Sequence, residues 1–297
     1  MNKDPIEFFS AGVSCRGMHW IPDRDDSSLP CVVLAPGFGG TYDGGLIQFA
    51  EAFCCAGFHS VAFDYRHFGG SDGEPRQLVS IRRQLEDWKA GIDFARSLDG
   101  VDPERIAIVG TSFSGGHALV VASEDKRIAA VVAQCPLMDG RSGLLNLARY
   151  AGAGYLARVI FHGLRDLSRA MTGRAPWHIP IVGAPGSVAA MTTPDALPGF
   201  TAISPPDVRN EVCARIGLAV GTYRPVTRAA RLGSPLLIQI CDRDKVAPIA
   251  AAEVVAAKVS GPVEIFRYDC GHFDVYQAPW FERLSGDQIE FLRQRLF

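Results

Sequence analysis

The sequence has almost no excess of charge of either sign. Among its 297 residues, 30 Lys and Arg stand against 32 Asp and Glu, which gives a formal net charge of −2. Nucleic acids and anionic membranes favour proteins with a strongly basic surface. The balanced composition therefore indicates neither partner. We expect a small-molecule substrate and consider a homodimer as an assembly.

Long apolar runs are also absent. A membrane-spanning helix needs about 20 consecutive apolar residues, and the most apolar candidate, Tyr155 to Leu164, is interrupted by Arg158. The first residues, MNKDPIEFF, do not contain the apolar core of a signal peptide. We therefore expect a cytoplasmic protein.

The eight cysteines include no C-x-x-C pair. Most of them lie in apolar segments, where a reduced Cys behaves as a small hydrophobic residue. This pattern argues against a zinc site and against a disulfide framework, and it agrees with free thiols in a reducing compartment. We expect neither a metal ion nor an organic cofactor.

Short apolar segments typical of buried strands alternate with helix-like segments over much of the chain. The first thirty residues alternate apolar and polar positions, which predicts an antiparallel hairpin. The expected parallel strands are 31–35, 58–63, 105–109, 128–133, 235–240 and 263–268, and the expected helices are 45–56, 80–98, 116–123, 249–258 and 280–296. This alternation predicts an α/β fold, with a mostly parallel central sheet flanked by helices.

The alternation lapses between Leu137 and Leu232. This stretch contains helix-like sequence, such as 144–169, and a loop rich in Pro and Gly at 175–206. It is too long for a plain connection, so it should have structure of its own. We expect a core formed by 1–136 and 233–297, and a helical lid formed by 137–232.

The strongest chemical motif is GTSFSGG at residues 110–116, between an expected strand and an expected helix. In that context a G-x-S-x-G turn exposes a nucleophilic serine. The register is ambiguous, because Ser112 has Gly two residues before it but Ser two residues after it, and Ser114 has the reverse. We favour Ser112 because Gly110 directly ends the strand. A phosphate-binding Gly/Ser turn is another interpretation, but it lacks the Lys of a P-loop.

A serine hydroxyl needs a base to become nucleophilic. His272 lies in DCGHFD (269–274), after the last expected strand, whereas His117 lies inside the helix that follows the serine. The base in turn needs an acid that orients it. Asp244 lies in CDRDKVAP (241–248), after the strand 235–240, with Asp242 and Asp139 as alternatives.

Together these motifs resemble those of the α/β-hydrolase superfamily, over nearly the whole chain outside the insert. The chain order Ser, Asp, His is the one that this fold uses, and Asp244 with Pro248 matches the family's D-x-x-x-P spacing. The resemblance implies a catalytic triad of Ser112, Asp244 and His272. Among subgroups, the chain most resembles esterase-like hydrolases related to dienelactone hydrolases and Xaa-Pro peptidases, and fungal polyketide acyltransferases carry a similar elbow.

Acyl transfer places negative charge on the carbonyl oxygen, which two backbone N–H groups should stabilise. One is expected from Phe113, the residue after the nucleophile. By resemblance, the other comes from Phe38 in the loop PGFGG (36–40), where Pro36 replaces the family's usual His. An ordinary Gly-rich turn is the alternative for this loop.

The insert should lie over the carboxyl edge of the sheet, where open α/β sheets bind ligands. Its apolar residues suggest an acyl pocket, although many could simply pack the lid onto the core. The pocket candidates are Tyr150, Phe161, Trp177 and Met191.

These features predict a serine hydrolase that cleaves a carboxylic ester with a hydrophobic acyl group through an acyl-serine intermediate. A thioesterase or an acyltransferase would use the same triad, for example in polyketide acyl transfer. A binding protein built on a catalytically dead hydrolase fold is the alternative from another class.

Overall fold

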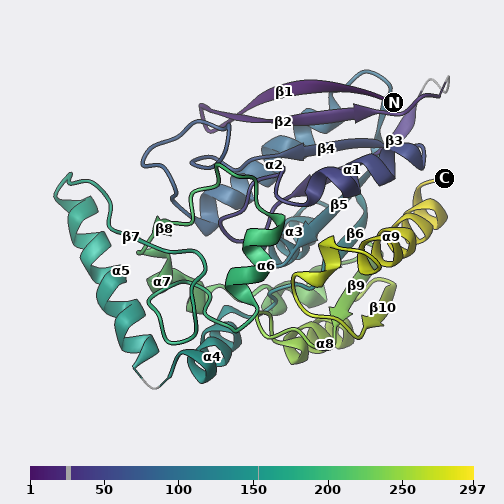
Figure 1. Cartoon of the computed structure of the whole chain (residues 1–297). Coiled ribbons are helices and arrows are strands. Elements are labelled where there is room, and N and C mark those ends of the chain that lie inside the picture. The colour runs from purple at the N-terminus through teal and green to yellow at the C-terminus, as the bar shows by residue number, and fades with distance from the viewer. Residues whose placement is uncertain (25–27, 153) are drawn as a thin grey trace.

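The computed structural model describes residues 1–24, 28–152 and 154–297. Its centre is an eight-stranded sheet with helices on both faces (Figure 1). The strand order is β1-β2-β4-β3-β5-β6-β9-β10, with β1 and β2 antiparallel at one edge and the strands from β4 to β10 parallel. The strands are β1 (Asn2–Ser10), β2 (Val13–Ile21), β3 (Leu29–Ala35), β4 (His59–Phe63), β5 (Val101–Thr111), β6 (Ile128–Gln134), β9 (Leu236–Cys241) and β10 (Val263–Tyr268).

The helices of the core cover the sheet in two layers. Helices α1 and α9 pack on one face, and helices α2, α3 and α8 pack on the other. Their bounds are α1 (Leu46–Cys55), α2 (Ile81–Arg96), α3 (Phe113–Glu124), α8 (Ile249–Lys258) and α9 (Trp280–Leu296), and the short helix η3 (Asp274–Tyr276) precedes α9. The predicted α/β class with a mostly parallel sheet is confirmed.

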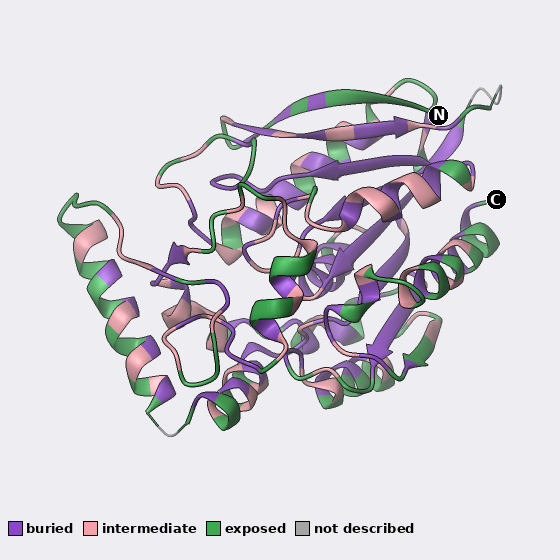
Figure 2. Cartoon of the chain, in the orientation of Figure 1, coloured by how far each residue is buried: buried purple, intermediate pink, exposed green. Residues whose placement is uncertain are grey.

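The buried segments of the central strands are mostly apolar because both faces of the sheet are covered. In β3, Val33 packs on the α2 and α3 side, whereas Val32 and Leu34 pack on the α1 and α9 side. Successive side chains of a strand point to opposite faces, so a strand buried on both sides loses the polar alternation of an exposed one. Figure 2 shows the resulting buried sheet at the centre of the molecule.

The insert is built from short helices and two short strands. They are α4 (Gly140–Ala151), α5 (Tyr155–Met171), β7 (His178–Ile179), α6 (Ala196–Ile203), β8 (Val212–Cys213), α7 (Ile216–Ala219), η1 (Val220–Thr222) and η2 (Pro225–Arg231). The helix-like sequence at 144–169 thus forms parts of two helices, and α4 ends at Gly152, whose φ of +87° suits glycine. The stretch at 175–206 that was expected to be a loop contains β7 and α6.

A buried ion pair connects two segments of the insert that are far apart in the sequence. Arg215 Nε lies 2.6 Å from Asp166 Oδ2, and the Asp166 side chain is fully buried. The Asp166 carboxylate also accepts hydrogen bonds from the backbone N–H groups of Trp177 and Arg215. This one side chain therefore connects α5 with the segments that carry β7 and β8.

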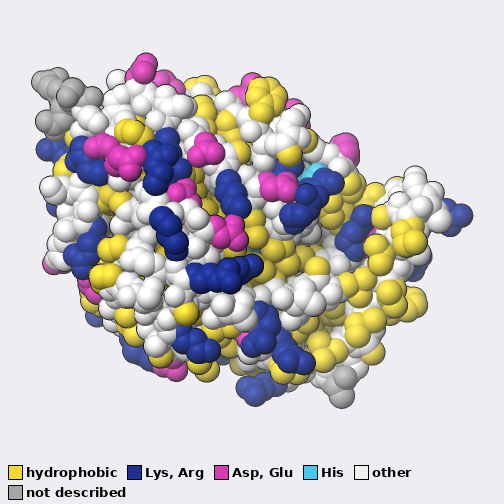
Figure 3. All heavy atoms as spheres, turned by 180° about the vertical axis from the view of Figure 1, so that it is seen from behind, with side chains coloured by type: hydrophobic (Ala, Val, Ile, Leu, Met, Phe, Trp, Pro, Cys, Tyr) yellow, Lys and Arg dark blue, Asp and Glu magenta, His cyan; other side chains and the backbone are white. Residues whose placement is uncertain are grey.

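The surface agrees with the balanced composition. Basic and acidic side chains are interspersed over the face shown in Figure 3. None of the helices in the described part of the chain has the length and apolar character needed to cross a bilayer.

Candidate active site

Ser112 occupies a strained turn between β5 and α3. Its φ of +55° and ψ of −119° lie outside the regions that residues other than glycine normally adopt. Two hydrogen bonds hold it there, because its N–H donates to Gln134 O and its carbonyl accepts from Leu137 N, both at 2.9 Å. This is the geometry of a nucleophile elbow, in which the turn projects the serine hydroxyl from the sheet edge.

Close packing around the turn explains which positions must be glycine. A Cβ added at Gly110 would lie 2.2 Å from Ser114 O, and one at Gly115 would lie 2.6 Å from Pro136 Cβ. Neither approach leaves room for a side chain. The register centred on Ser112 thus has its required glycines two residues before and three residues after the serine.

Ser114 faces the interior instead of the site. Its side chain is fully buried, its hydroxyl lies 2.7 Å from the Tyr65 hydroxyl, and it accepts a hydrogen bond from Trp88 Nε1 at 3.1 Å. Ser112, by contrast, lines two pockets. The geometry therefore favours Ser112 as the nucleophile.

The three residues expected to form a triad lie together. His272 Nε2 is 2.9 Å from Ser112 Oγ, and His272 Nδ1 is 2.6 Å from Asp244 Oδ2. The other carboxylate oxygen of Asp244 accepts hydrogen bonds from the backbone N–H groups of Val246 and Ala247 at 2.7 and 2.8 Å. The side chains of His272 and Asp244 are only 4% and 2% exposed. Both carboxylate oxygens of Asp244 thus have hydrogen-bond partners, one oxygen in the backbone and the other in the His272 imidazole.

The alternative acids have other partners. Asp242 forms an ion pair with Arg267 at 2.6 Å. Asp139 caps α4 by accepting from the N–H groups of Arg141 and Ser142, and it pairs with Arg224 at 2.8 Å. Neither contacts His272 within the described residues.

His117 has a structural environment. Its ring is fully buried between the Tyr223 hydroxyl at 2.6 Å and the Gln84 side-chain oxygen at 3.1 Å. Burial lowers the pKa of His117 to about 3, so the ring is neutral. It links α3 with the insert at Tyr223 and with α2 at Gln84.

The electrostatics of the pair favour a histidine that gains a proton easily. Burial opposes a charge on His272, but the adjacent Asp244 carboxylate outweighs this effect and raises the pKa of His272 well above its usual value. An imidazolium formed by taking the serine proton is therefore stabilised.

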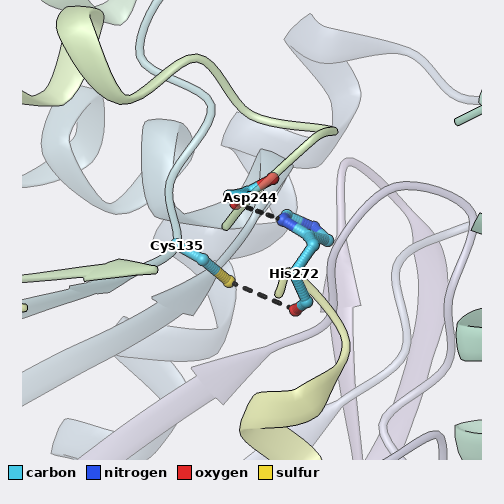
Figure 4. A group of neighbouring side chains, drawn as sticks. All are labelled: Cys135, Asp244 and His272. Atoms are coloured by element: carbon cyan, nitrogen blue, oxygen red, sulfur yellow. Dashed lines mark hydrogen bonds and ion pairs between the residues drawn. The ribbon is translucent and has the colours of Figure 1, made fainter. Parts of the chain in front are cut away.

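Cys135 lies beside His272, with its sulfur directed at the His272 carbonyl, as Figure 4 shows. Its thiol donates a long hydrogen bond of 3.9 Å to the His272 carbonyl. The ligand atoms of Cys135, Asp244 and His272 lie within 4.8 Å of one another, and these are residue types that bind zinc. Since Asp244 and His272 already bond each other, a metal ion there would have to displace that bond.

The two expected oxyanion-hole residues lie beside the serine. Phe113 is the first residue of α3, where backbone N–H groups have no acceptor within the helix. The loop that carries Phe38 approaches closely, since a Cβ added at Gly37 would lie 3.2 Å from Ser112 Cβ. The rings of Phe38 and Phe113 pack edge to face at 5.5 Å. Two backbone segments thus converge on the serine.

The first of the two pockets at Ser112, the lid pocket, has about 670 Å³ of space, which includes the part that is open to solvent. Polar side-chain atoms among its described lining come from Ser112 and Tyr155, and the Tyr155 hydroxyl bonds the carbonyls of Ala189 and Ala190. The lid pocket includes Gly140, Gly143, Leu144, Leu147 and Val159.

Of the four pocket candidates, the structure brings only Met191 to the serine, where it lines both pockets. Phe161 is 61% exposed on the outer face of α5, and Tyr150 is 36% exposed on α4. Trp177 packs against the Arg165 guanidinium and the His162 ring. These three side chains do not line the lid pocket.

The residues of α4 that do line it were not among the four pocket candidates, although Leu144 and Leu147 belong to the apolar residues of the insert from which a pocket was expected. Positions 140, 143, 144 and 147 follow the i, i+3, i+4, i+7 spacing of one helix face. Because two of the four are glycines, the face has few apolar side chains and gives a weak signal. Its spacing was nevertheless present in the sequence.

The second pocket that Ser112 lines, the α6 pocket, has about 540 Å³ of space, which includes the part that is open to solvent. It shares Phe38, Ser112 and Met191 with the lid pocket, but His272 lines only the α6 pocket. Its further lining includes Phe200, Ile203, Val208 and Phe273. Phe273 follows His272 in the chain, whereas no sequence signal marked Ile203 or Val208 as neighbours of the serine.

Comparison with known proteins agrees with this geometry. The model of the "Alpha/beta hydrolase family" matches residues 32–283. The quorum-quenching protein AidA of Acinetobacter baumannii (strain MDR-ZJ06) is 39% identical over 291 residues, which cover 97% of this chain and 94% of the relative. The thiohydrolase apmlB of Arthrinium phaeospermum is 27% identical over 278 residues, which cover 89% of this chain and 88% of that protein.

The fold has close counterparts among solved structures. The alpha/beta hydrolase GrgF from Penicillium sp. sh18 superposes with a TM-score of 0.81 at 22% identity, and the match covers 100% of this chain and 99% of that one. At this identity the likeness concerns the fold. Together with the family match over most of the sequence, it shows that the chain belongs to the alpha/beta hydrolase family.

Proposed function

We propose that this protein is a serine hydrolase that cleaves a carboxylic ester with a hydrophobic acyl group through an acyl-serine intermediate. The observation that carries the proposal is the continuous chain of hydrogen bonds from Asp244 through His272 to Ser112. The chain ends at the mouth of the apolar lid pocket. The expected nucleophile Ser112 thus contacts the expected base and also lines an apolar pocket.

In the proposed first step, Ser112 Oγ attacks the ester carbonyl carbon and its proton passes to His272 Nε2. The oxyanion that forms accepts hydrogen bonds from the backbone N–H groups of Phe38 and Phe113. The tetrahedral intermediate collapses when the carbon–oxygen bond to the alcohol breaks. His272 then gives its proton to the departing oxygen, which leaves as the neutral alcohol.

In the second step, water replaces the alcohol. His272 takes a proton from the water as its oxygen attacks the acyl carbon, and the bond to Ser112 Oγ breaks. The same proton returns to the serine, and the free acid leaves. Throughout, the buried Asp244 carboxylate keeps Nδ1 protonated and stabilises the transient imidazolium.

The lid pocket supports a hydrophobic acyl group. Its lining is almost entirely hydrocarbon, and its polar Tyr155 hydroxyl is already hydrogen-bonded to the backbone. A polar acyl chain would lose hydrogen bonds to water there without replacing them. An alkyl or aryl chain would instead gain about 25 cal/mol for each Å² of apolar surface removed from water.

A thioester or an acyl-transfer substrate is the second candidate. Relatives carry the names thiohydrolase and polyketide transferase, and a thioester would react at the same Ser112. The two functions differ in the leaving atom and in the acceptor, so paired substrates separate them.

The first experiment is intact mass spectrometry after treatment with a fluorophosphonate, which labels activated serines. We expect one adduct on the wild type, none on Ser112→Ala, and one on Ser114→Ala. Loss of the adduct only in Ser114→Ala would move the nucleophile by two residues. No adduct on the folded wild type would contradict a working triad and favour a binding protein on this fold.

The second experiment compares an oxygen ester and a thioester that carry the same octanoyl chain. A kcat/KM that is higher for the oxygen ester than for the thioester would support the proposal. A thioester preferred by more than the difference in intrinsic reactivity would favour the second candidate. Ser112→Ala serves as the blank for each substrate.

A further inference from the structure

Helix α5 carries a row of exposed apolar side chains along its outer side. Five of its large apolar residues are between 40% and 80% exposed, and we call them the α5 stripe: Ile160, Phe161, Leu164, Leu167 and Met171. Residues 160, 164, 167 and 171 have the spacing that places side chains on one face of a helix. Single exposed apolar side chains are common on soluble proteins, but a continuous row of them marks a surface that has a partner.

The opposite side of α5 is occupied by the protein itself. Tyr155, Val159, Gly163 and Asp166 are buried, and Tyr155 and Val159 line the lid pocket. These contacts, together with packing of α5 against α7, determine which side of the helix faces outward. The helix lies at one end of the molecule (Figure 1), and hydrophobic side chains gather along that edge in Figure 3. Within the described residues, the α5 stripe is therefore open to solvent.

The charge around the α5 stripe has one sign. The segment 140–194 contains a single acidic residue, Asp166, whose buried carboxylate already pairs with Arg215. The same segment contains six arginines, which are Arg141, Arg149, Arg158, Arg165, Arg169 and Arg174. The balanced composition of the whole chain thus conceals a basic region in the insert.

The three arginines of α5 have no carboxylate partner among the described residues. Arg158 and Arg169 donate to backbone carbonyls, and the Arg165 guanidinium lies 3.4 Å from the centre of the Trp177 ring. Residues 158, 165 and 169 also share one helix face, because they are seven and four positions apart. They form an arginine row along α5 whose positive charge is not neutralised within the protein.

A second copy of this chain would fit the α5 stripe poorly. In a two-fold dimer the same surface meets itself, so the arginine rows of the two copies would repel each other. A stable protein interface also uses about 20–30 residues on each side, whereas the stripe supplies five. A phospholipid bilayer can accept a single amphipathic helix, because acyl chains adapt to its apolar side while anionic headgroups attract its arginines.

We infer that α5 docks on the surface of an anionic phospholipid bilayer, with the α5 stripe among the acyl chains and the arginine row at the level of the headgroups. The helix lies along the surface, since none of the helices in the described part of the chain could cross a bilayer. The overall charge did not indicate a membrane partner, but the local distribution of charge and apolar surface does. The inference is independent of the chemistry at Ser112.

Co-sedimentation of the full chain with vesicles tests the docking. We expect the wild type and Ser112→Ala to bind vesicles of equimolar phosphatidylglycerol and phosphatidylcholine. Leu164→Glu combined with Leu167→Glu should lower the partition coefficient by about tenfold, because it removes apolar contacts and adds negative charge. Leu197→Glu combined with Val254→Glu is the matched control, since these side chains are 40% and 41% exposed on α6 and α8. The control makes the same change of charge away from α5 and should bind like the wild type.

The arginine row is tested by salt and by substitution. Raising the salt concentration from about 0.1 M to about 1 M shortens the Debye length from about 10 Å to about 3 Å, so binding to the anionic vesicles should weaken. Arg165→Gln combined with Arg169→Gln should weaken it as well and reduce its salt dependence. Arg82→Gln combined with Arg127→Gln removes the same charge from exposed positions outside the insert and serves as the control.

A fluorescent label can report whether α5 itself contacts the lipid. Of the eight cysteines, Cys55 is exposed and the other seven are buried, so Cys55→Ser provides a background without an accessible thiol. In that background, Leu164→Cys and Val254→Cys each receive an environment-sensitive fluorophore. We expect the emission of the label at position 164 to shift to shorter wavelength on anionic vesicles, and the emission of the label at position 254 to stay unchanged.

The outcomes separate docking from catalysis. Absence of binding, equal binding to vesicles of phosphatidylcholine alone, or a label at position 164 that stays in water would each overturn the inference. A dimer in solution that Leu164→Glu with Leu167→Glu dissociates would assign the stripe to a second copy instead. Vesicle binding without a fluorophosphonate adduct on Ser112 would overturn the proposed function and leave the docking in place. Urea denaturation identifies the variants that are folded before their binding is compared.

Discussion

The hydroxyl of Ser114 lies 2.7 Å from the hydroxyl of Tyr65, in the interior beneath the turn that carries Ser112. The same hydroxyl accepts a hydrogen bond from Trp88 Nε1. Position 114 is thus the one at which the G-x-S-x-G motif has its second glycine, but this chain has a buried hydroxyl with two partners there. The serine two residues after Ser112 is a structural element of the turn.

Replacing Ser114 by alanine should therefore lower stability and spare activity. The substitution leaves the buried Tyr65 hydroxyl and the Trp88 N–H without their partner, which should cost about 1–3 kcal/mol of unfolding free energy. Urea denaturation measures this loss. Ser123→Ala is the matched control, since the Ser123 hydroxyl only bonds the Val120 carbonyl within the same helix. Equal stability of the two variants would contradict the role given to Ser114.

The pH dependence of the reaction should reflect the Asp244–His272 pair. A protonated imidazole cannot accept the Ser112 proton, and Asp244 raises the pKa of His272 well above its usual value. We therefore expect kcat/KM to rise with pH, with a midpoint above the usual histidine pKa of about 6.5.

Asp244→Asn tests the origin of that midpoint. Loss of the carboxylate should move the midpoint to lower pH and reduce the plateau by about 10³–10⁴-fold, because the imidazole loses its orientation and its counter-charge. Asp242 lies in the same loop as Asp244 but pairs with Arg267 of β10. Asp242→Asn therefore controls for the general electrostatic effect of removing a carboxylate there. A midpoint that moves equally in both variants would argue against Asp244 as the partner.

The local sequence predicts Ser112, Asp244 and His272 better than it predicts the residues of the lid pocket. Gly110 and the strand before it define the elbow, because strand, turn and helix are adjacent in the chain. His272 and Asp244 also follow strands directly, and parallel strands bring their carboxyl ends to one edge of the sheet. Sequence order and strand ends were therefore enough to suggest these three residues.

The pocket depends on which face of a lid helix turns inward, and periodicity does not decide this for α5. The helix carries apolar residues on two faces. Tyr155 and Val159 are buried and line the lid pocket, whereas Ile160 and Phe161 are 50% and 61% exposed. Phe161 was expected to contact the lid pocket because it is aromatic, but it does not line that pocket. Packing of α5 against α7 orients the helix so that Phe161 faces outward.

The buried ion pair between Asp166 and Arg215 should stabilise the folded structure of the insert. Asp166→Ala leaves the Arg215 guanidinium without its partner and leaves two backbone N–H groups without an acceptor. Removing one member of a buried pair typically costs 3–5 kcal/mol, and partial exposure of Arg215 reduces this to about 2–4 kcal/mol.

Hydrogen exchange can localise that loss. We expect faster exchange in α5 and at Trp177 in the Asp166→Ala variant, with the central strands unchanged. Asp93→Ala is a suitable control, because Asp93 is 76% exposed in its ion pair with Arg96 and should contribute at most about 0.5 kcal/mol. Uniformly faster exchange over the whole chain would contradict a role confined to the lid.

A buried histidine pair between β2 and β4 should make the fold sensitive to acid. His19 Nε2 lies 2.9 Å from His59 Nδ1, and both rings are at most 5% exposed. Burial, with the neighbouring His59 as a second cause, lowers the pKa of His19 to about 4, and burial also lowers the pKa of His59. Both rings are therefore neutral in the folded protein at neutral pH.

The sign of the effect follows from proton uptake. Between about pH 6.5 and pH 4 the unfolded chain protonates His19 and the folded chain does not, so acid favours unfolding. The pair's contribution to stability is present above pH 6.5 and is lost as the pH falls toward 4, by at most about 1.4 kcal/mol per pH unit for each histidine. Urea denaturation of the wild type and of His19→Gln at pH 8, 7, 6 and 5 separates this contribution from those of His272 and Asp64, whose pKa values are raised in the folded protein. The difference in unfolding free energy between the two proteins should be nearly constant at pH 8 and 7 and should change at pH 6 and 5 in the direction that destabilises the wild type, because one fewer proton is taken up when His19→Gln unfolds; a difference that is the same at all four pH values would show that His19 is not among the groups responsible.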